Sequence, residues 1–151
     1  MANSGPRANM QHTTSQATTW SEMLIEETPL IDQTGVLAGL VTIELHDADE
    51  RTCRHVATLV RHKLTRTDAS DLGGDGTLSL LLTPVLGLVD LHQRVHELQT
   101  NIADAGHSAT LGYALRRPTE SLVDTWARSI AEVHRAAFAR DRGDSTLVLP
   151  E

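Results

Sequence analysis

Hydrophobic and polar positions follow two different patterns along this chain. Residues 36–45 are mostly apolar and rich in β-branched side chains, which predicts a buried central strand. Elsewhere apolar residues recur every three or four positions, which predicts helices with one buried face. Three such stripes stand out: Cys53, Val56, Val60 and Leu64; Leu88, Leu91, Val95, Leu98 and Ile102; and Leu122, Trp126, Ile130, Val133 and Ala137.

Turn and capping residues place the boundaries between these elements. Gly73-Gly74-Asp75-Gly76 lies between two short runs, 69–72 and 77–82, and predicts a β-hairpin. The other expected elements are a helix from Asp47 or Asp49 to about Thr65, a helix from Pro84 to Gly106, a strand at 107–114, a helix from Pro118 to Gly143 and a last strand at 145–149.

The chain divides into a tail and one domain. Residues 1–19 are polar without an apolar period, which predicts a disordered arm. Residues 20–27 are expected to form one or two helical turns that Pro29 ends. Residues 20–151 then form a single domain of the α+β class, with the order β-α-β-β-α-β-α-β. The first six elements form a ferredoxin-like unit, which is a mostly antiparallel sheet with helices on one face.

Composition narrows the classes of partner. The net charge is -7 with His neutral, and the 13 Lys and Arg residues are spread out without a run of five. This pattern argues against a nucleic-acid or anionic-membrane surface, which needs a basic patch. No run of apolar residues approaches the length of a membrane span, and the first residues lack the order of a signal peptide, so a cytoplasmic protein is expected. The single cysteine, Cys53, lies on an apolar stripe and is expected to be a buried structural thiol.

A strand, a helix and a hairpin that turns on Gly-Gly-Asp resemble the nucleotide-cyclase palm, and residues 32–149 resemble the GGDEF (diguanylate cyclase) domain. Residues 71–78 match its Arg-x-GGDEF signature hairpin, and residues 40–45 are similar to its first strand. Three further segments carry the resemblance: 32–36 to the opening Asp-x-Leu-Thr-Gly-Leu, 108–114 to the Thr-Val-Ser-Ile-Gly-Val-Ala strand, and 136–143 to the closing helix, with Arg140 where a lysine would stand.

The resemblance implies a set of candidate site residues. Diguanylate cyclases join two GTP molecules with metal ions that carboxylates hold. On this pattern Gly73, Gly74, Asp75, Gly76 and Arg140 are candidates for nucleotide binding. Glu44 aligns best with the first-strand metal aspartate and Asp47 is the alternative, so the candidate metal ligands are Glu44, Asp47 and Asp75. Mg²⁺ is the cofactor implied if a nucleotide binds. Arg66 and Asp68 lie near the place of the family's inhibitory Arg-x-x-Asp motif, one residue short of its spacing.

Several features of the family are absent. Gly76 replaces the signature glutamate and Thr77 the signature phenylalanine. The Asp-x-Asp-x-Phe-Lys-x-x-Asn-Asp stretch and the Asn-Arg helix after the opening motif are missing. Base recognition and one metal contact therefore have no visible source, and no residue is assigned a catalytic role.

Three hypotheses follow from this eroded pattern. The first is a non-catalytic, degenerate GGDEF-like domain that regulates a protein partner, with GTP or cyclic di-GMP as candidate ligands. The second is a divergent, Mg-dependent and homodimeric diguanylate cyclase that uses Glu44 and Asp75. The third is a purely structural dimerisation module in which 73–76 is only a turn.

Overall fold

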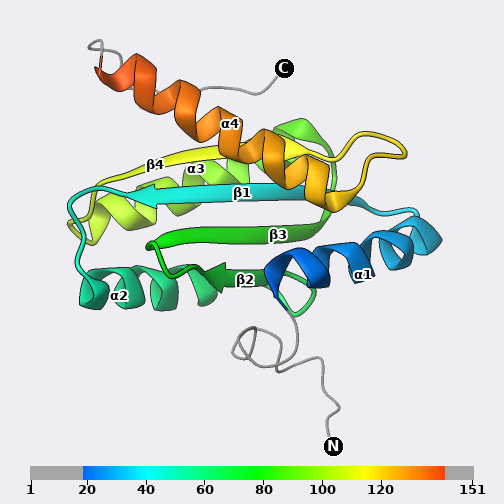
Figure 1. Ribbon diagram of the computed structural model, residues 1–151, viewed down its shortest axis with the longest axis horizontal. Coiled ribbons are helices and arrows are strands. Elements are labelled where there is room, and N and C mark those ends of the chain that lie inside the picture. The colour runs from blue at the N-terminus through cyan, green and yellow to red at the C-terminus, as the bar shows by residue number, and fades with distance from the viewer. Residues whose placement is uncertain (1–18, 142–151) are drawn as a thin grey trace, which may run out of the picture.

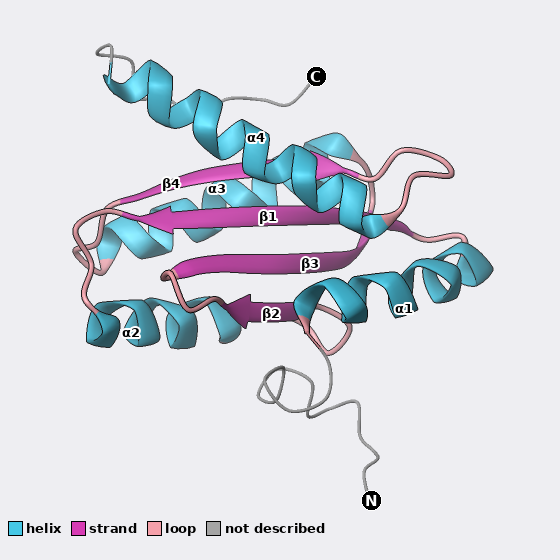
Figure 2. Ribbon diagram, in the orientation of Figure 1, coloured by secondary structure: helices cyan, strands magenta, loops and turns pink. Residues whose placement is uncertain are grey.

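The computed structural model describes residues 19–141, with side chains to residue 139. The expected arm at 1–19, apart from Thr19, and the expected strand at 145–149 lie outside the described residues. Four helices and four strands follow in the order α1 (Trp20–Thr34), β1 (Leu37–Leu45), α2 (Glu50–Arg61), β2 (Ala69–Leu72), β3 (Thr77–Val85), α3 (Leu88–Asp104), β4 (Ala109–Leu115) and α4 (Leu122–Asp141). Figure 2 shows these elements by type.

The strands form one sheet in the order β2-β3-β1-β4, and every neighbouring pair is antiparallel. This order confirms the predicted α+β, ferredoxin-like arrangement. One core lies between the sheet and the pair α2 and α3. A second core, which includes Trp20, Leu24 and Leu122, lies between α1, the start of α4 and the other face of the sheet. Figure 1 shows α4 in front of β4 and β1, and α3 behind them.

α1 is longer than the sequence predicts. Pro29 was expected to end it, but the helix continues to Thr34 and stops at Gly35, whose φ of 73° is left-handed. Pro29 is exposed and costs the helix one backbone hydrogen bond. The buried side chain of Ile31 lies beyond it, and the Gly35 N–H donates to the Ile31 carbonyl at 3.0 Å. Tertiary packing therefore carries the helix through the proline.

The third strand also extends further than expected. Pro84 was expected to open a helix, but it lies inside β3, and α3 begins only at Leu88. Val85 pairs with Leu37 of β1 and is buried, whereas Pro84 is exposed. The other helix ends differ less: α2 ends at Arg61 rather than near Thr65, and α4 begins at Leu122 rather than near Pro118.

α4 packs on the sheet through a more polar face than its apolar stripe predicts. Thr125, Ser129 and Glu132 are buried, whereas Trp126 and Ile130 are only half-buried. The Ser129 hydroxyl lies 2.7 Å from that of Thr42 on β1. Small side chains on α4 allow the helix to approach Gly112 of β4 at backbone distance. In the described part of the chain, no helix is both long and apolar enough to cross a membrane.

An ion pair holds the β4–α4 connection in place. Arg128 donates through Nε to Glu120 Oε2 at 2.9 Å and through Nη2 to Oε1 at 2.7 Å. Arg117 N–H and the Thr125 hydroxyl also donate to Oε1. The hydrogen bond from Arg128 is the main reason that the pKa of Glu120 falls from 4.5 to about 2. Because both side chains are largely buried, the pair contributes to stability.

This pKa shift predicts an acid-dependent stability. A carboxyl with a depressed folded-state pKa stabilises the fold above its unfolded-state pKa and loses that contribution as the pH falls from 4.5 towards 2. We expect Glu120→Gln to lower the free energy of unfolding at pH 7 by about 2 kcal/mol and to flatten its change below pH 4.5. Urea titrations across this pH range measure both effects. Glu26→Gln, on the exposed face of α1, should change neither; equal effects of the two variants would contradict the assignment.

Candidate functional site

The candidate residues gather at the end of the sheet where β1 stops and the β2–β3 turn begins. Glu44, near the end of β1, pairs with Thr77 of β3 on one side and with Thr110 of β4 on the other. Residues 73–76 join β2 to β3 at this same end, which is the left end in Figure 1. The antiparallel register thus places Glu44 and the Gly-Gly-Asp turn on neighbouring strands.

The turn is closed by its own hydrogen bonds. The Gly73 N–H donates to the Thr77 carbonyl at 2.9 Å, and the Gly76 N–H donates to the Gly73 carbonyl at 3.0 Å. One carboxylate oxygen of Asp75 accepts from the Thr77 N–H at 3.0 Å. Asp75 is exposed. Its side chain therefore stabilises the turn locally while still facing solvent.

Gly76 is the position where the turn departs most from the signature. Its φ of 85° lies in the left-handed region that residues with a Cβ rarely adopt. A Cβ at this position would lie 3.1 Å from the Sγ of Cys53. Cys53 is buried on α2, as its stripe predicts. The backbone of this turn therefore suits glycine, and the glutamate of the signature would strain it.

The other acidic candidates do not converge. Glu44 and Asp47 are exposed, and Asp47 has a φ of 51° just after β1. Asp49 is the residue that caps α2: its Oδ1 accepts from the Thr52 N–H at 2.8 Å, and this bond holds the pKa of Asp49 below its usual value. Glu50 pairs with Arg54 on the surface of the same helix. The acidic stretch 47–50 thus serves mainly the start of α2.

The described residues offer no ready site for Mg²⁺. No group of three or more His, Cys, Asp or Glu side chains in residues 19–139 is arranged to hold a metal ion. Mg²⁺ requires a near-octahedral set of oxygen ligands. Glu44, Asp47 and Asp75 do not supply such a set in this arrangement.

A histidine that the sequence did not single out lies at the same end of the sheet. His46 follows β1, and its Nδ1 lies 2.7 Å from the Ser108 hydroxyl while its Nε2 lies 2.6 Å from the Thr110 hydroxyl. The His46 N–H also donates to the Ser108 carbonyl. These contacts tie the end of β1 to the start of β4. The partners are more than sixty positions apart in the chain, and no local pattern connects them.

Asp68, the candidate remnant of an inhibitory site, has a structural role. Its side chain is completely buried and accepts three hydrogen bonds: from the N–H groups of Thr65 at 2.8 Å and Thr83 at 2.9 Å, and from Arg94 Nη2 at 2.6 Å. Arg66 is exposed. The Asp68 carboxylate therefore fastens the α2–β2 loop to β3 and α3. Because these hydrogen bonds engage both of its oxygens, the carboxylate is not available to a ligand.

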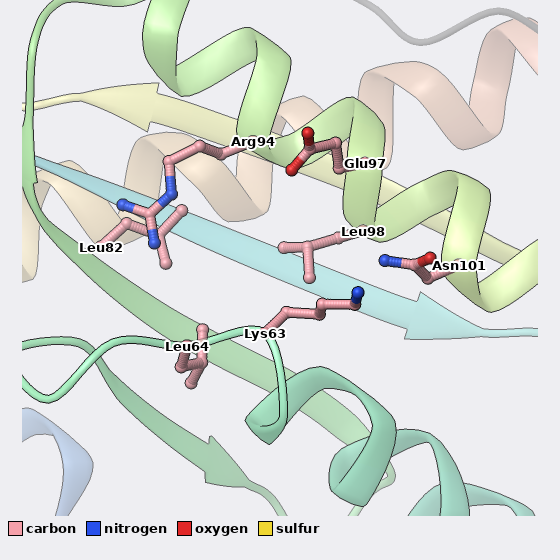
Figure 3. A pocket seen from close by; sticks show the side chains of 7 residues that line it. All are labelled: Lys63, Leu64, Leu82, Arg94, Glu97, Leu98 and Asn101. Carbon is pink, nitrogen blue, oxygen red and sulfur yellow. The ribbon is translucent and has the colours of Figure 1, made fainter.

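A shallow pocket lies beside this ion pair. Figure 3 shows its lining by α3, by β3 and by the residues after α2, which include Lys63. The space amounts to about 30 Å³. Pockets for nucleotide-sized ligands measure roughly 300 Å³ or more, so this one accommodates only a water or two.

Arg140 and His92 both lie on helices, but the structure describes the side chain of His92 alone. Arg140 lies in the last turn of α4, but its side chain is outside the described residues. His92, on α3, is half-buried, and its Nδ1 lies 2.6 Å from the Tyr113 hydroxyl. Burial raises the pKa of Tyr113 to about 12. His92 therefore belongs to the packing of α3 on β4.

Comparisons with known proteins place the fold. No family model matches the sequence, and no curated protein matches it. Among solved structures, the GGDEF domain of DgcB from Caulobacter crescentus in complex with c-di-GMP is 12% identical over 85% of this chain and 86% of that one, with a TM-score of 0.71. The active GGEEF domain of a diguanylate cyclase from Vibrio cholerae is 10% identical over 82% and 88%, with a TM-score of 0.63.

A third similar structure contains a protein partner. Diguanylate cyclase SiaD from Pseudomonas aeruginosa, in complex with its activator SiaC, is 20% identical over 84% of this chain and 55% of that one, with a TM-score of 0.69. At such low identities these matches establish the architecture and leave the chemistry open. This chain has the fold of the GGDEF domain.

Proposed function

We propose that this chain is a degenerate GGDEF-like domain that makes no cyclic di-GMP and regulates other proteins through direct contacts. The observation that carries the proposal is the turn at Gly76. Its left-handed backbone and its contact with Cys53 favour glycine where the signature has a metal-side glutamate. The packing of α2 against the turn thus disfavours a return of the signature glutamate at this position.

The absence of a convergent acidic group supports the non-catalytic half of the proposal. Phosphoryl transfer depends on positioned charge that neutralises the transferring group, and carboxylate-bound metal ions supply it in enzymes of this type. The described residues hold no group of three potential metal ligands. A chain that lacks this arrangement retains the scaffold without the means to activate GTP.

Gly73, Gly74 and Asp75 keep the first three residues of the GGDEF signature, and this makes a guanine nucleotide the ligand to test. Gly74 leaves the backbone of the turn open, because no heavy atom lies within 4 Å of the place of a Cβ there. Asp75 is exposed beside them. A guanine nucleotide or cyclic di-GMP would have to bind on this open surface, with Mg²⁺ if the triphosphate binds.

Calorimetric titration of the full chain tests the ligand part. GTP with Mg²⁺ and cyclic di-GMP are titrated separately into wild type and into Asp75→Asn. The asparagine oxygen can still accept from the Thr77 N–H, so this variant removes the charge and keeps the turn. Binding that weakens at least about tenfold in Asp75→Asn would place the ligand at the turn. An absence of heat with both ligands would remove nucleotide binding and leave protein contacts as the whole function.

Restoring the signature glutamate should not restore activity. We expect Gly76→Glu to lower the free energy of unfolding by about 1–2 kcal/mol, because a side chain at a φ of 85° is strained and its Cβ meets Cys53. We also expect no cyclic di-GMP from GTP. Urea unfolding and product chromatography are the measurements, and Gly74→Glu, in open space, is the control. A Gly76→Glu protein that is as stable as wild type and gains GTP turnover would sink the proposal.

A divergent cyclase is the second candidate function, because Glu44 and the turn that carries Asp75 lie on neighbouring strands. This alternative predicts metal-dependent consumption of GTP by a homodimer, which Asp75→Ala abolishes. The third hypothesis, a structural module, predicts that Asp75→Ala changes stability alone.

A further inference from the structure

One acid-free segment of this acidic chain, most of α2 and the loop that follows it, is rich in basic residues. Residues 51–66 contain five of the 13 Lys and Arg residues and none of the 20 Asp and Glu residues. The rest of the chain is correspondingly more acidic than the net charge of -7 indicates.

The fold turns the three arginines of α2 outward on one side of the helix. α2 buries Cys53, Val56, Ala57 and Val60 against the sheet. The opposite side presents exposed positions three and four residues apart, which we call the basic stripe: Arg51, Arg54, His55, Arg61 and His62. Arg54 pairs with Glu50, but both side chains are exposed (61% and 86%), so this pair contributes little stability and exchanging it for another partner costs little.

α1 presents a stripe of complementary character. Its exposed positions recur with the same helical spacing and form what we call the α1 stripe: Glu22, Ile25, Glu26 and Leu30. Ile25 and Leu30 are 61% and 47% exposed and lie beside the two glutamates. Apolar side chains beside carboxylates suit arginines, whose aliphatic stems pack on apolar surface while the guanidinium groups reach the acids.

The two stripes cannot neutralise each other within one molecule. α2 packs on the face of the sheet that carries the first core, and α1 packs on the opposite face. A second copy of the chain supplies the missing partner. We propose that the basic stripe of α2 in one copy docks on the α1 stripe of another copy.

This self-association concerns surfaces away from the Gly-Gly-Asp turn and is independent of nucleotide binding. If both copies exchange the contact, the product is a closed dimer; if only one contact forms, copies add head to tail. One helix-on-helix contact is small, so we expect a dissociation constant on the order of 10–100 µM at low salt. Ion pairs across the contact should make it sensitive to salt.

Sedimentation equilibrium of the purified full chain, without nucleotide, tests the proposal. We expect the mass to rise above that of a monomer between about 10 and 500 µM protein at low salt, and about 0.5 M NaCl to weaken association by about tenfold. Glu22→Lys with Glu26→Lys should abolish association, and so should Arg54→Glu with Arg61→Glu. Glu97→Lys with Asp104→Lys, exposed acids on α3, should leave it unchanged.

Mixing the two reversed proteins gives the sharpest test. The Glu22→Lys, Glu26→Lys protein has two basic stripes, and the Arg54→Glu, Arg61→Glu protein has two acidic ones. The basic α2 of the former therefore complements the acidic α1 of the latter. We expect the mixture to associate although each protein alone is monomeric, and circular dichroism should show that both are folded. A monomeric wild type at low salt, a mixture that stays monomeric, or binding of the basic stripe to heparin without self-association would overturn the proposal.

Discussion

Replacing Gly112 by alanine is expected to lower the free energy of unfolding by about 3 kcal/mol or more. Gly112 lies in β4, directly under α4. A Cβ there would lie 2.4 Å from the Val133 nitrogen and 2.6 Å from the Ser129 carbonyl oxygen. Both are backbone atoms of the helix, so no side-chain rotation relieves the contact. The helix must move away from the sheet, which also separates Ser129 from Thr42.

Urea unfolding followed by circular dichroism measures this effect. Gly74→Ala is the matched control, because no heavy atom lies within 4 Å of the added Cβ and the change should stay within about 0.5 kcal/mol. A Gly112→Ala protein with the midpoint of wild type would show that α4 does not approach β4 as closely as described. Gly112 lies in the segment that resembles the GGDEF strand, and the close approach of α4 gives this glycine a packing reason within this chain.

Removal of the buried Asp68 carboxylate should be equally damaging. Asp68→Ala leaves Arg94, whose side chain is 22% exposed, without its partner, and leaves the Thr65 and Thr83 N–H groups unsatisfied. Loss of one partner from a buried ion pair costs about 3–5 kcal/mol. We expect a cost in this range, because the carboxylate closes the α2–β2 loop onto β3 and α3.

A double-mutant cycle with Arg94→Met separates the ion pair from the rest of the network. We expect a coupling energy of about 1–3 kcal/mol between the two side chains, measured by urea unfolding. The residual cost of Asp68→Ala in the Arg94→Met background then reports the two backbone hydrogen bonds. A total cost of Asp68→Ala below about 1 kcal/mol would mean that the carboxylate is free for another role.

Sequence patterns predicted the parts of the fold that depend on local signals. Of the predicted stripe Leu88, Leu91, Val95, Leu98 and Ile102, the last four are buried as expected, because helical spacing alone sets which residues share a face, whereas Leu88 at the start of α3 is exposed. The hairpin around 73–76 formed because glycine and aspartate satisfy the turn locally. In contrast, the length of α1 depends on Ile31 reaching a core that brings together Leu40, Leu81 and Leu122, and no local pattern contains that information.

The candidate site was predictable only in part, for the same reason. The adjacency of Glu44 to the turn follows from strand order, and the predicted topology supplied it. The bonds of His46 and the burial of Asp68 join residues that are distant in the chain, so composition and spacing could not show them. The polar face of α4 depends on Gly112, which lies on another element.

Incubation of the purified chain with GTP and Mg²⁺, followed by chromatography of the products, tests the central claim most directly. A diguanylate cyclase assayed in parallel verifies that the conditions support synthesis. The account predicts no cyclic di-GMP above the protein-free blank, since Gly76 stands in place of the signature glutamate and the described acids do not converge. Production of cyclic di-GMP that disappears in Asp75→Ala would contradict it and establish the chain as a divergent cyclase.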